Sequence, residues 1–465
     1  AAPAGGYCVG AAKREITPRS PVYLGGYGFG PVRKSVGVAS PLWARALAIA
    51  RGGTTVVLCA IDTQGHFLAY QAEERGSQMG FAAIRRRVAQ DRGLPERNLI
   101  LAATHDHSGP DDAGLWGGVP AAYLQLVAAQ TVAAIEAAIQ AERPATLYRA
   151  EVDTAPVHLL RNLLPPSYPL DTELRTIFAR DGRGQTFAAL VNFSAHVAVL
   201  GKDNRLVSPD WPGAAANAIE RSAPGSVAVV MVGSVGRTLP DLTGIAKRGP
   251  AAVEEYGDKV AKLALHSEAG AELIDGPIAA SETVLEEPID NRVLASLTTG
   301  GIPGADRVMR ANRPPYLEGH KIRTVVGAMR IGALFLAAVP GESFPETEKL
   351  LEERVASQGH LLFSLAEDEL GYDPPPYEVG LVEYFSPLDE GLFIISPSFG
   401  TDVTRALLAE AAQLGFPLSD NRYTDYEHAR MSILDSVKAS IGALEEPLCR
   451  GLILIALWLG WNRFS

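Results

Sequence analysis

Short runs of apolar residues alternate with longer amphipathic stretches along most of the chain. Apolar runs rich in β-branched residues are typical of buried strands, and apolar residues that recur at helical spacing are typical of helices. Their alternation predicts an α/β domain. The predicted strands are Thr54–Ile61, Asn98–Ala103, Phe187–Phe193, Ser226–Val232, Leu334–Val339 and His360–Leu365. The predicted helices are Gln71–Asp91, Pro120–Glu142, Pro209–Arg221, Ala251–Leu273, Glu346–Ala356 and Thr401–Leu414.

The pattern shows no clear linker before about residue 416. We therefore expect one domain over residues 1–415 and a C-terminal extension over residues 416–465. The most apolar part of the extension is Gly451–Trp461, about half the length of roughly 20 residues that a spanning helix needs. We expect this segment to dock on the body of the protein or on a second subunit. Peripheral contact with a membrane surface is the alternative.

Composition excludes two classes of protein. Of the 465 residues, 47% are hydrophobic and 20% are charged, which excludes global disorder and supplies enough apolar material for a core. The formal net charge is −11. A nucleic-acid partner is not expected, because binding to phosphates needs a surplus of Lys and Arg.

The three cysteines are too few and too scattered for a disulfide framework or a CxxC metal site. Cys59 lies in an apolar run and is expected to be a buried small hydrophobe. Cys8 and Cys449 either form one bridge or stay unpaired. The opening residues Ala1–Ala4 resemble the sequence left after cleavage by a signal peptidase, which predicts a secreted or periplasmic protein.

Polar, chemically capable residues follow five of the predicted strands. Ligands of α/β proteins bind beyond the carboxyl ends of the strands. If the five strands share an orientation, their ends converge on one pocket. The segments that follow the strands are Thr104–Gly109, Ser194–His196, Gly233–Thr238, Pro340–Ser343 and Glu367–Tyr372.

The His105-x-His107 pair is the sharpest local signal. In an extended segment, residues two apart point the same way, so both imidazoles can face one cavity. Imidazole is a leading ligand for zinc, and His196 and Glu342 can complete such a site. The alternative is a surface loop or a hydrogen-bonded structural pair. His66, beyond another strand end, is expected at most at the edge of the pocket.

On these motifs the sequence resembles the neutral, non-lysosomal ceramidases, zinc amidases that hydrolyse the N-acyl bond of ceramide. The likeness covers roughly residues 8–414 and keeps the order of the motifs. Thr104–Pro110 is similar to the family's THTHSGP signature, with Asp106 in place of the middle threonine. The other matching segments are Gly10–Pro18, Gly25–Gly28, Ala195–His196 with Leu206–Asp210, Val339–Glu342, and Gly371–Tyr372 to Tyr384.

The resemblance implies mixed β-sheets flanked by helices and one zinc ion (Zn2+) held by four side chains. The implied zinc ligands are His105, His196, Glu342 and Tyr372. The implied contacts to substrate or transition state are His107, Arg161 and Tyr384. Zinc makes hydroxide available as a nucleophile at neutral pH. His107 can then move a proton onto the leaving amine, and Arg161 and Tyr384 can donate hydrogen bonds to the oxyanion.

Two departures from the family change the expected substrate. The family's serine, in a Gly-x-x-Ser-Pro segment, is replaced by Leu239, with Thr238 one residue earlier. The chain is also too short for the family's immunoglobulin-like C-terminal domain. We therefore expect a zinc-dependent hydrolase that cleaves an N-acyl amide, in ceramide or a related N-acyl lipid, by attack of zinc-bound hydroxide. The alternatives are a zinc esterase or amidase for a smaller substrate, or a non-catalytic descendant that binds zinc or lipid; the oligomeric state stays open.

Overall fold

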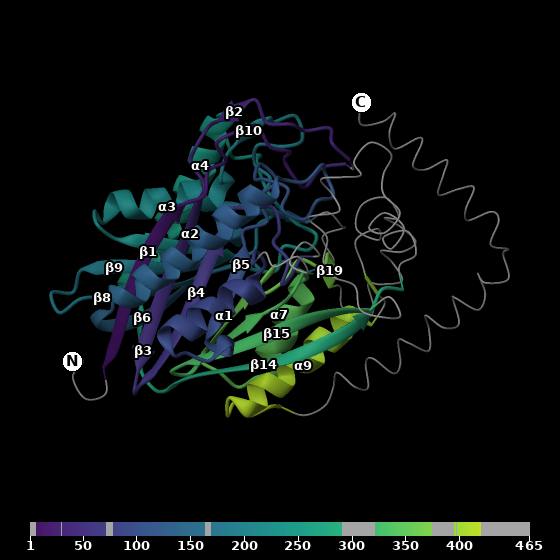
Figure 1. The fold of residues 1–465 in the computed structure, drawn as a ribbon. Helices are drawn as coiled ribbons and strands as arrows, with labels where there is room; N and C mark the ends of the chain where they lie inside the picture. Colours follow the sequence, from purple (N-terminus) through teal and green to yellow (C-terminus); the bar gives the residue numbers. More distant parts are fainter. Residues whose placement is uncertain are drawn as a thin grey trace, which may run out of the picture.

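The computed structural model describes residues 6–28, 30–70, 78–162, 169–290, 321–373, 395–396 and 398–419 (Figure 1). A large β-sheet has the strand order β11-β9-β8-β6-β1-β3-β4-β5, and β13 pairs with β6. Its strands are β1 Tyr7–Glu15, β3 Trp43–Arg51, β4 Thr54–Ile61, β5 Leu99–Ala103, β6 Arg143–Asp153, β8 Glu173–Arg180, β9 Thr186–Phe193, β11 Val227–Val232 and β13 Glu272–Ile274.

At each edge of this sheet the last two strands are parallel: β4 with β5 at one edge, and β9 with β11 at the other. The neighbouring strands from β9 through β8, β6, β1 and β3 to β4 are all paired antiparallel. Followed through the ladder, β5 and β9 therefore run in opposite senses. The sheet nevertheless curls until β11 lies against β3 and β4, since twist of about 20–25° accumulates at every strand. The loops after β5 and β9 consequently meet, and His107 N donates to Val197 O at 3.0 Å.

A second sheet has the order β14-β15-β16-β18, with β16 and β18 parallel. Its strands are β14 Ile278–Pro288, β15 Lys321–Ile331, β16 Leu334–Ala338 and β18 Gly359–Phe363. Three two-stranded pairs lie near the strand ends: β2 Gly37–Val38 with β10 Leu206–Val207, β7 Leu160–Asn162 with β12 Thr238–Pro240, and β17 Glu342–Ser343 with β19 Tyr372–Asp373.

The two sheets pack face to face between outer layers of helices (Figure 1). Leu58 and Met231 of the large sheet share one apolar cluster with Leu336 and Phe363 of the second sheet. The outer face of the large sheet packs on the helices α1 Phe81–Arg92, α2 Ala121–Gln140, α3 Asp210–Ser222 and α4 Pro250–Ser267. The outer face of the second sheet packs on α7 Pro345–Arg354 and α9 Phe399–Gln413.

One helix of the described part, α2, is long and apolar enough by length and composition to cross a membrane. In this fold α2 packs on β1 and β3, so its apolar residues belong to the core. Cys59 is fully buried in the same core, as the sequence predicts.

The predicted α/β architecture of mixed sheets flanked by helices is confirmed. Each of the six predicted strands is present within two residues of its expected bounds. Two predicted helices are wrong in extent. The helix expected over Ala251–Leu273 ends at Ser267, because Leu273 instead pairs with Tyr148 in the large sheet. The helix expected from Gln71 begins at Phe81, and residues 71–77 lie outside the described residues.

The predicted domain boundary at residue 416 stays a prediction. Phe416 packs against the Phe335 ring with the centroids 5.5 Å apart, and Leu418 forms a β-bridge with Val355. Residues 420–465, which include Cys449 and the apolar segment Gly451–Trp461, lie outside the described residues.

Candidate metal centre

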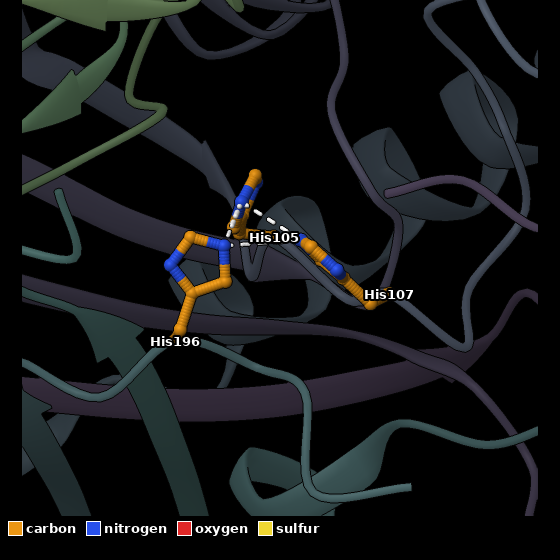
Figure 2. Close-up of side chains that lie close together, drawn as sticks. All are labelled: His105, His107 and His196. Atoms are coloured by element: carbon orange, nitrogen blue, oxygen red, sulfur yellow. Dashed lines mark hydrogen bonds between the residues drawn. The ribbon is translucent and has the colours of Figure 1, made fainter. Parts of the chain in front are cut away.

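Three buried imidazoles turn their Nε2 atoms toward one another (Figure 2). His105 and His107 follow β5, and His196 follows β9. The Nε2 atoms are 2.9 Å apart between His105 and His196, and 3.1 Å apart in each pair that includes His107. A proton on one nitrogen can be donated to one neighbour only, whereas a cation among the three can accept all three lone pairs. The cluster therefore has the donor arrangement of a metal site.

Hydrogen bonds at the far side of two rings fix which nitrogen carries the proton. His105 Nδ1 lies 3.2 Å from Gln64 O, and His196 Nδ1 lies 3.1 Å from Val235 O. Since a carbonyl oxygen only accepts, the proton is on Nδ1 and the Nε2 lone pair faces the cluster. Donation of the second ring N–H to a carbonyl is the usual support of a metal-ligating histidine.

His107 differs from the other two histidines. Its Nδ1 is buried and has no hydrogen-bond partner in the described part of the chain. The ring instead meets Tyr27 edge-on, with centroids 4.7 Å apart, and lies where a Cβ on Gly26 would fall. By this criterion His105 and His196 have the support expected of metal ligands, and His107 is the imidazole free to take up and release protons.

The backbone of the His105–His107 segment is not the extended strand that the spacing suggests. His105 has φ 62°, in the left-handed region that a residue with a side chain rarely adopts. The imidazoles converge as expected, but they do so because the backbone turns at His105 and not because the residues alternate along a strand. Hydrogen bonds hold this turn, since Asp106 N donates to Thr63 O at 3.0 Å and Ser108 N donates to Asp106 Oδ1 at 2.8 Å.

Glu342, in β17 beyond the end of β16, brings a carboxylate to the cluster. Its Oε2 lies 3.2 Å from His105 Nε2 and 3.7 Å from His196 Nε2. Tyr372 is its register partner in β19 and hydrogen-bonds to the carboxylate. Burial raises the pKa of Glu342, but the electrostatic interactions and hydrogen bonds with His105, His196 and Tyr372 outweigh it and lower that pKa.

Two of the imidazoles, His107 and His196, are held in the neutral form. Burial, reinforced by the neighbouring histidines, lowers the pKa of His107 well below its ordinary value. Burial and the electrostatic interaction with His105 lower the pKa of His196 to about 4. At neutral pH both rings keep the lone pairs that metal binding and proton transfer require.

Arg161 and Leu239 face each other at the edge of the site. They are register partners in the antiparallel β7–β12 pair, and Arg161 is exposed. The charge of Arg161 interacts electrostatically with the phenol of Tyr27. Burial and Asp210 raise the pKa of this phenol, whereas Arg33 and Arg161 act to lower it. Tyr384 lies outside the described residues, so its role stays a prediction.

Sequence reasoning missed the arginine that holds the histidine loop. Arg33 is buried and donates hydrogen bonds to the carbonyl oxygens of Gly25, His107 and Asn204 at 2.9, 3.0 and 3.1 Å. Its guanidinium also lies over the Tyr27 ring, 4.8 Å from the centroid. No spacing or motif marks this residue. His66 lies outside the cluster, since its ring nitrogens contact Asp112 Oδ2 and Met79 O.

Neither a protein-family model nor a curated protein matches this chain. Solved structures share its fold, among them two ceramidases. The neutral ceramidase from Pseudomonas aeruginosa is 20% identical, with a TM-score of 0.71 over 88% of this chain and 74% of that chain. A ceramidase complexed with C2 is 19% identical, with a TM-score of 0.72 over 90% of this chain and 77% of that chain. The likeness confirms, at the level of the fold, the resemblance expected from the motifs.

Proposed function

We propose that this protein is a zinc-dependent amide hydrolase of the neutral ceramidase family that cleaves ceramide or a related N-acyl lipid. The observation that carries the proposal is the convergence of three buried imidazoles and the Glu342 carboxylate at the strand ends of a ceramidase fold. A structural histidine cluster has no need of three Nε2 atoms gathered within 3.1 Å of one another.

The side chains present fit a zinc ion. His105 and His196 would supply two imidazole nitrogens with fixed tautomers, and Glu342 would supply a carboxylate oxygen. Two imidazoles and one carboxylate form a ligand set typical of catalytic zinc, which keeps one position for water or substrate. Tyr372, already hydrogen-bonded to Glu342, lies beside this set as a fourth ligand or as support for the carboxylate.

A bound zinc ion would supply positive charge that acidifies water and polarises the substrate carbonyl. Beside it, neutral His107 accepts a proton from the attacking water at Nε2 and returns it to the amine nitrogen as the amide bond breaks. The Tyr27 ring and the Arg33 hydrogen bond hold His107 in place for both transfers. Arg161 donates hydrogen bonds to the oxygen that becomes negative.

The substrate is inferred from the solved relatives, which are ceramidases. Leu239 favours a second candidate, an N-acyl amine or ester smaller than ceramide, since it places an apolar side chain opposite Arg161. Both candidates use the same residues and differ only in the groups that surround the cleaved bond. A location outside the cytoplasm also stays a prediction.

A hydrolysis screen tests the proposal. Protein loaded with zinc is incubated with ceramides and with other N-acyl amines and esters, and the released amine or alcohol is measured by mass spectrometry. We expect release of sphingosine from ceramide, with loss of the reaction in a chelator and recovery on adding zinc back. Hydrolysis of another N-acyl compound alone would keep the chemistry and replace the substrate, and no hydrolysis of any member would refute the proposal.

A further inference from the structure

The segment 32–38 has one outward and one inward face. Val32, Val36 and Val38 are 57%, 65% and 49% exposed, and Lys34 shares their face. Arg33 and Ser35, between them, are buried. We name the four outward residues the valine face. We propose that the valine face is a docking surface for an anionic lipid surface.

Exposed apolar side chains concentrate here. The described part of the chain exposes eight large hydrophobic side chains, and three of them lie within these seven residues. Large apolar side chains gathered on one exposed patch mark an interaction site, whereas single ones need no explanation. Valines at this spacing can enter the boundary between headgroups and acyl chains together.

Charge around the valine face selects the kind of partner. β2 pairs with β10, and the exposed residues beside it include Lys202, Asp203 and Arg205. Together with Lys34 they give three cations against one carboxylate, in a protein whose formal net charge is −11. A local positive surplus around apolar residues complements an anionic lipid surface, which the rest of this acidic protein would repel.

The inward face of the same segment is attached to the metal centre. Arg33 donates to the carbonyl oxygens of His107 and Asn204, and Asn204 Nδ2 donates to Ser108 Oγ at 3.0 Å. Figure 1 shows β2 and β10 at one tip of the molecule. Docking through the valine face would therefore bring the loop that carries His107 next to the lipid. The choice of a lipid partner rests on the proposed function.

Vesicle sedimentation tests the surface. The full chain is spun with vesicles of phosphatidylcholine alone or of phosphatidylcholine mixed with phosphatidylglycerol. We expect stronger binding to the mixed vesicles, which weakens as salt is added. The double variant Val36→Asp/Val38→Asp should bind at least about tenfold more weakly, because two apolar contacts are lost. Lys34→Glu should weaken binding to the mixed vesicles about fivefold or more.

A matched control introduces the same two aspartates at exposed apolar positions outside the valine face. Leu273→Asp/Val284→Asp alters two side chains that are 57% and 54% exposed, in β13 and β14, and should bind vesicles like the wild type. Equal binding of Val36→Asp/Val38→Asp and wild type, or equal loss in the control, would refute the docking surface. So would a wild type that ignores the phosphatidylglycerol content.

Two further measurements separate this inference from its alternatives. A dimer that Val36→Asp/Val38→Asp converts to a monomer, seen by light scattering, would assign the valine face to a second copy and refute the lipid assignment. Hydrolysis of a water-soluble short-chain N-acyl amine should be the same in this variant and the wild type. Wild type that binds mixed vesicles but hydrolyses nothing would refute the proposed function and leave the docking surface standing.

Discussion

The guanidinium of Arg33 donates a hydrogen bond to the carbonyl oxygen of His107 at 3.0 Å, 74 residues away along the chain. The same side chain binds Gly25 O and Asn204 O and covers the Tyr27 ring. Three loops and the aromatic ring against His107 thus depend on one buried cation. A hydrogen bond to a charged group contributes about 1.5–3 kcal/mol, so this cation decides the position of the loop.

Arg33→Met should lower the unfolding free energy by at least about 2 kcal/mol, because three carbonyl groups, two of them buried, lose their donor. It should also lower kcat more than it raises KM, since His107 would no longer be held for proton transfer. Arg33→Lys should recover part of both losses. Denaturant unfolding and steady-state kinetics on a soluble N-acyl amine measure the two effects.

Arg85→Met is the matched control for this experiment. Arg85 is also buried, pairs with Glu367 at 2.8 Å and donates to Glu96 O, but makes none of these contacts to the histidine loop. Its loss should destabilise the fold with kcat unchanged. An Arg33→Met protein with normal kcat would remove the positioning role and leave Arg33 as a purely structural residue.

Metal content separates the roles of the three histidines. His105→Ala and His196→Ala should lose zinc, because each removes an imidazole whose tautomer a carbonyl fixes. His107→Ala should keep zinc and lose about 100-fold or more in kcat, as expected for a general acid–base. Elemental analysis of protein purified without added metal, beside turnover numbers, gives both readouts.

His360→Ala serves as the control in that series. His360 is buried and hydrogen-bonded to Val355 O, on β18, and belongs to no metal-binding group of the described residues. It should keep both zinc and activity. If His107→Ala loses zinc as completely as His105→Ala, His107 is a ligand and another group must move the proton.

The sequence predicts the strands that are continuous apolar runs, such as β9 and β11, because burial on both faces leaves a plain signal. It does not reveal β3, Trp43–Arg51, in which alanine occupies every second position. Alanine favours helices, and only pairing with β1 and β4 on either side makes this segment a strand. The strand at Glu272–Ile274 escapes for the same reason, since its pairing with β6 is a long-range contact.

In the site, too, local sequence patterns predict some features, and long-range contacts determine the others. Spacing and strand ends identify His105, His107, His196 and Glu342, because polar residues after an apolar run stand out in sequence. The meeting of β5 and β9 ends needs the curl of the whole sheet, which no local pattern encodes. The left-handed turn at His105 and the hydrogen bond from Arg33 to His107 O likewise depend on residues far apart along the chain.

His360 gives a prediction about stability and pH. Burial lowers the pKa of His360 to about 4, whereas an unfolded histidine titrates near 6.5. Below pH ~6.5 the His360 imidazole is protonated in the unfolded chain, whereas in the folded chain it stays neutral down to pH ~4. Stability from this group is therefore complete above pH ~6.5 and falls by roughly 3 kcal/mol as the pH drops to ~4.

His360→Leu should remove this part of the pH dependence. Urea unfolding of both proteins at several pH values between these limits gives the difference in unfolding free energy. The difference should shrink or reverse toward pH ~4, because the variant has no group to protonate. A difference that stays constant across the range would show that His360 titrates alike in the folded and unfolded chains.

Because Leu239 replaces the serine of the ceramidase family, the identity of the nucleophile has to be settled by experiment. Thr238 is fully buried, and its Oγ1 lies 3.4 Å from Gly236 O, while its carbonyl oxygen accepts from His196 N at 3.0 Å. Leu239, one residue on, is the half-exposed member of the strand and faces Arg161. The Thr238 hydroxyl therefore points to the opposite face from the side chain at the serine position.

We accordingly expect Thr238→Ala to keep turnover within about tenfold, a barrier change of no more than ~1.4 kcal/mol. Ser234, whose buried Oγ lacks a hydrogen-bond partner in the described residues, should likewise tolerate Ser234→Ala. Both outcomes fit direct attack by water with His107 as base. A side-chain nucleophile would instead give a covalent acyl-enzyme, visible by mass spectrometry of quenched reactions as added acyl mass on one of these residues. Such an adduct, or loss of turnover in Thr238→Ala that Thr238→Ser restores with zinc content unchanged, would assign the attack to the hydroxyl and overturn direct hydrolysis by water.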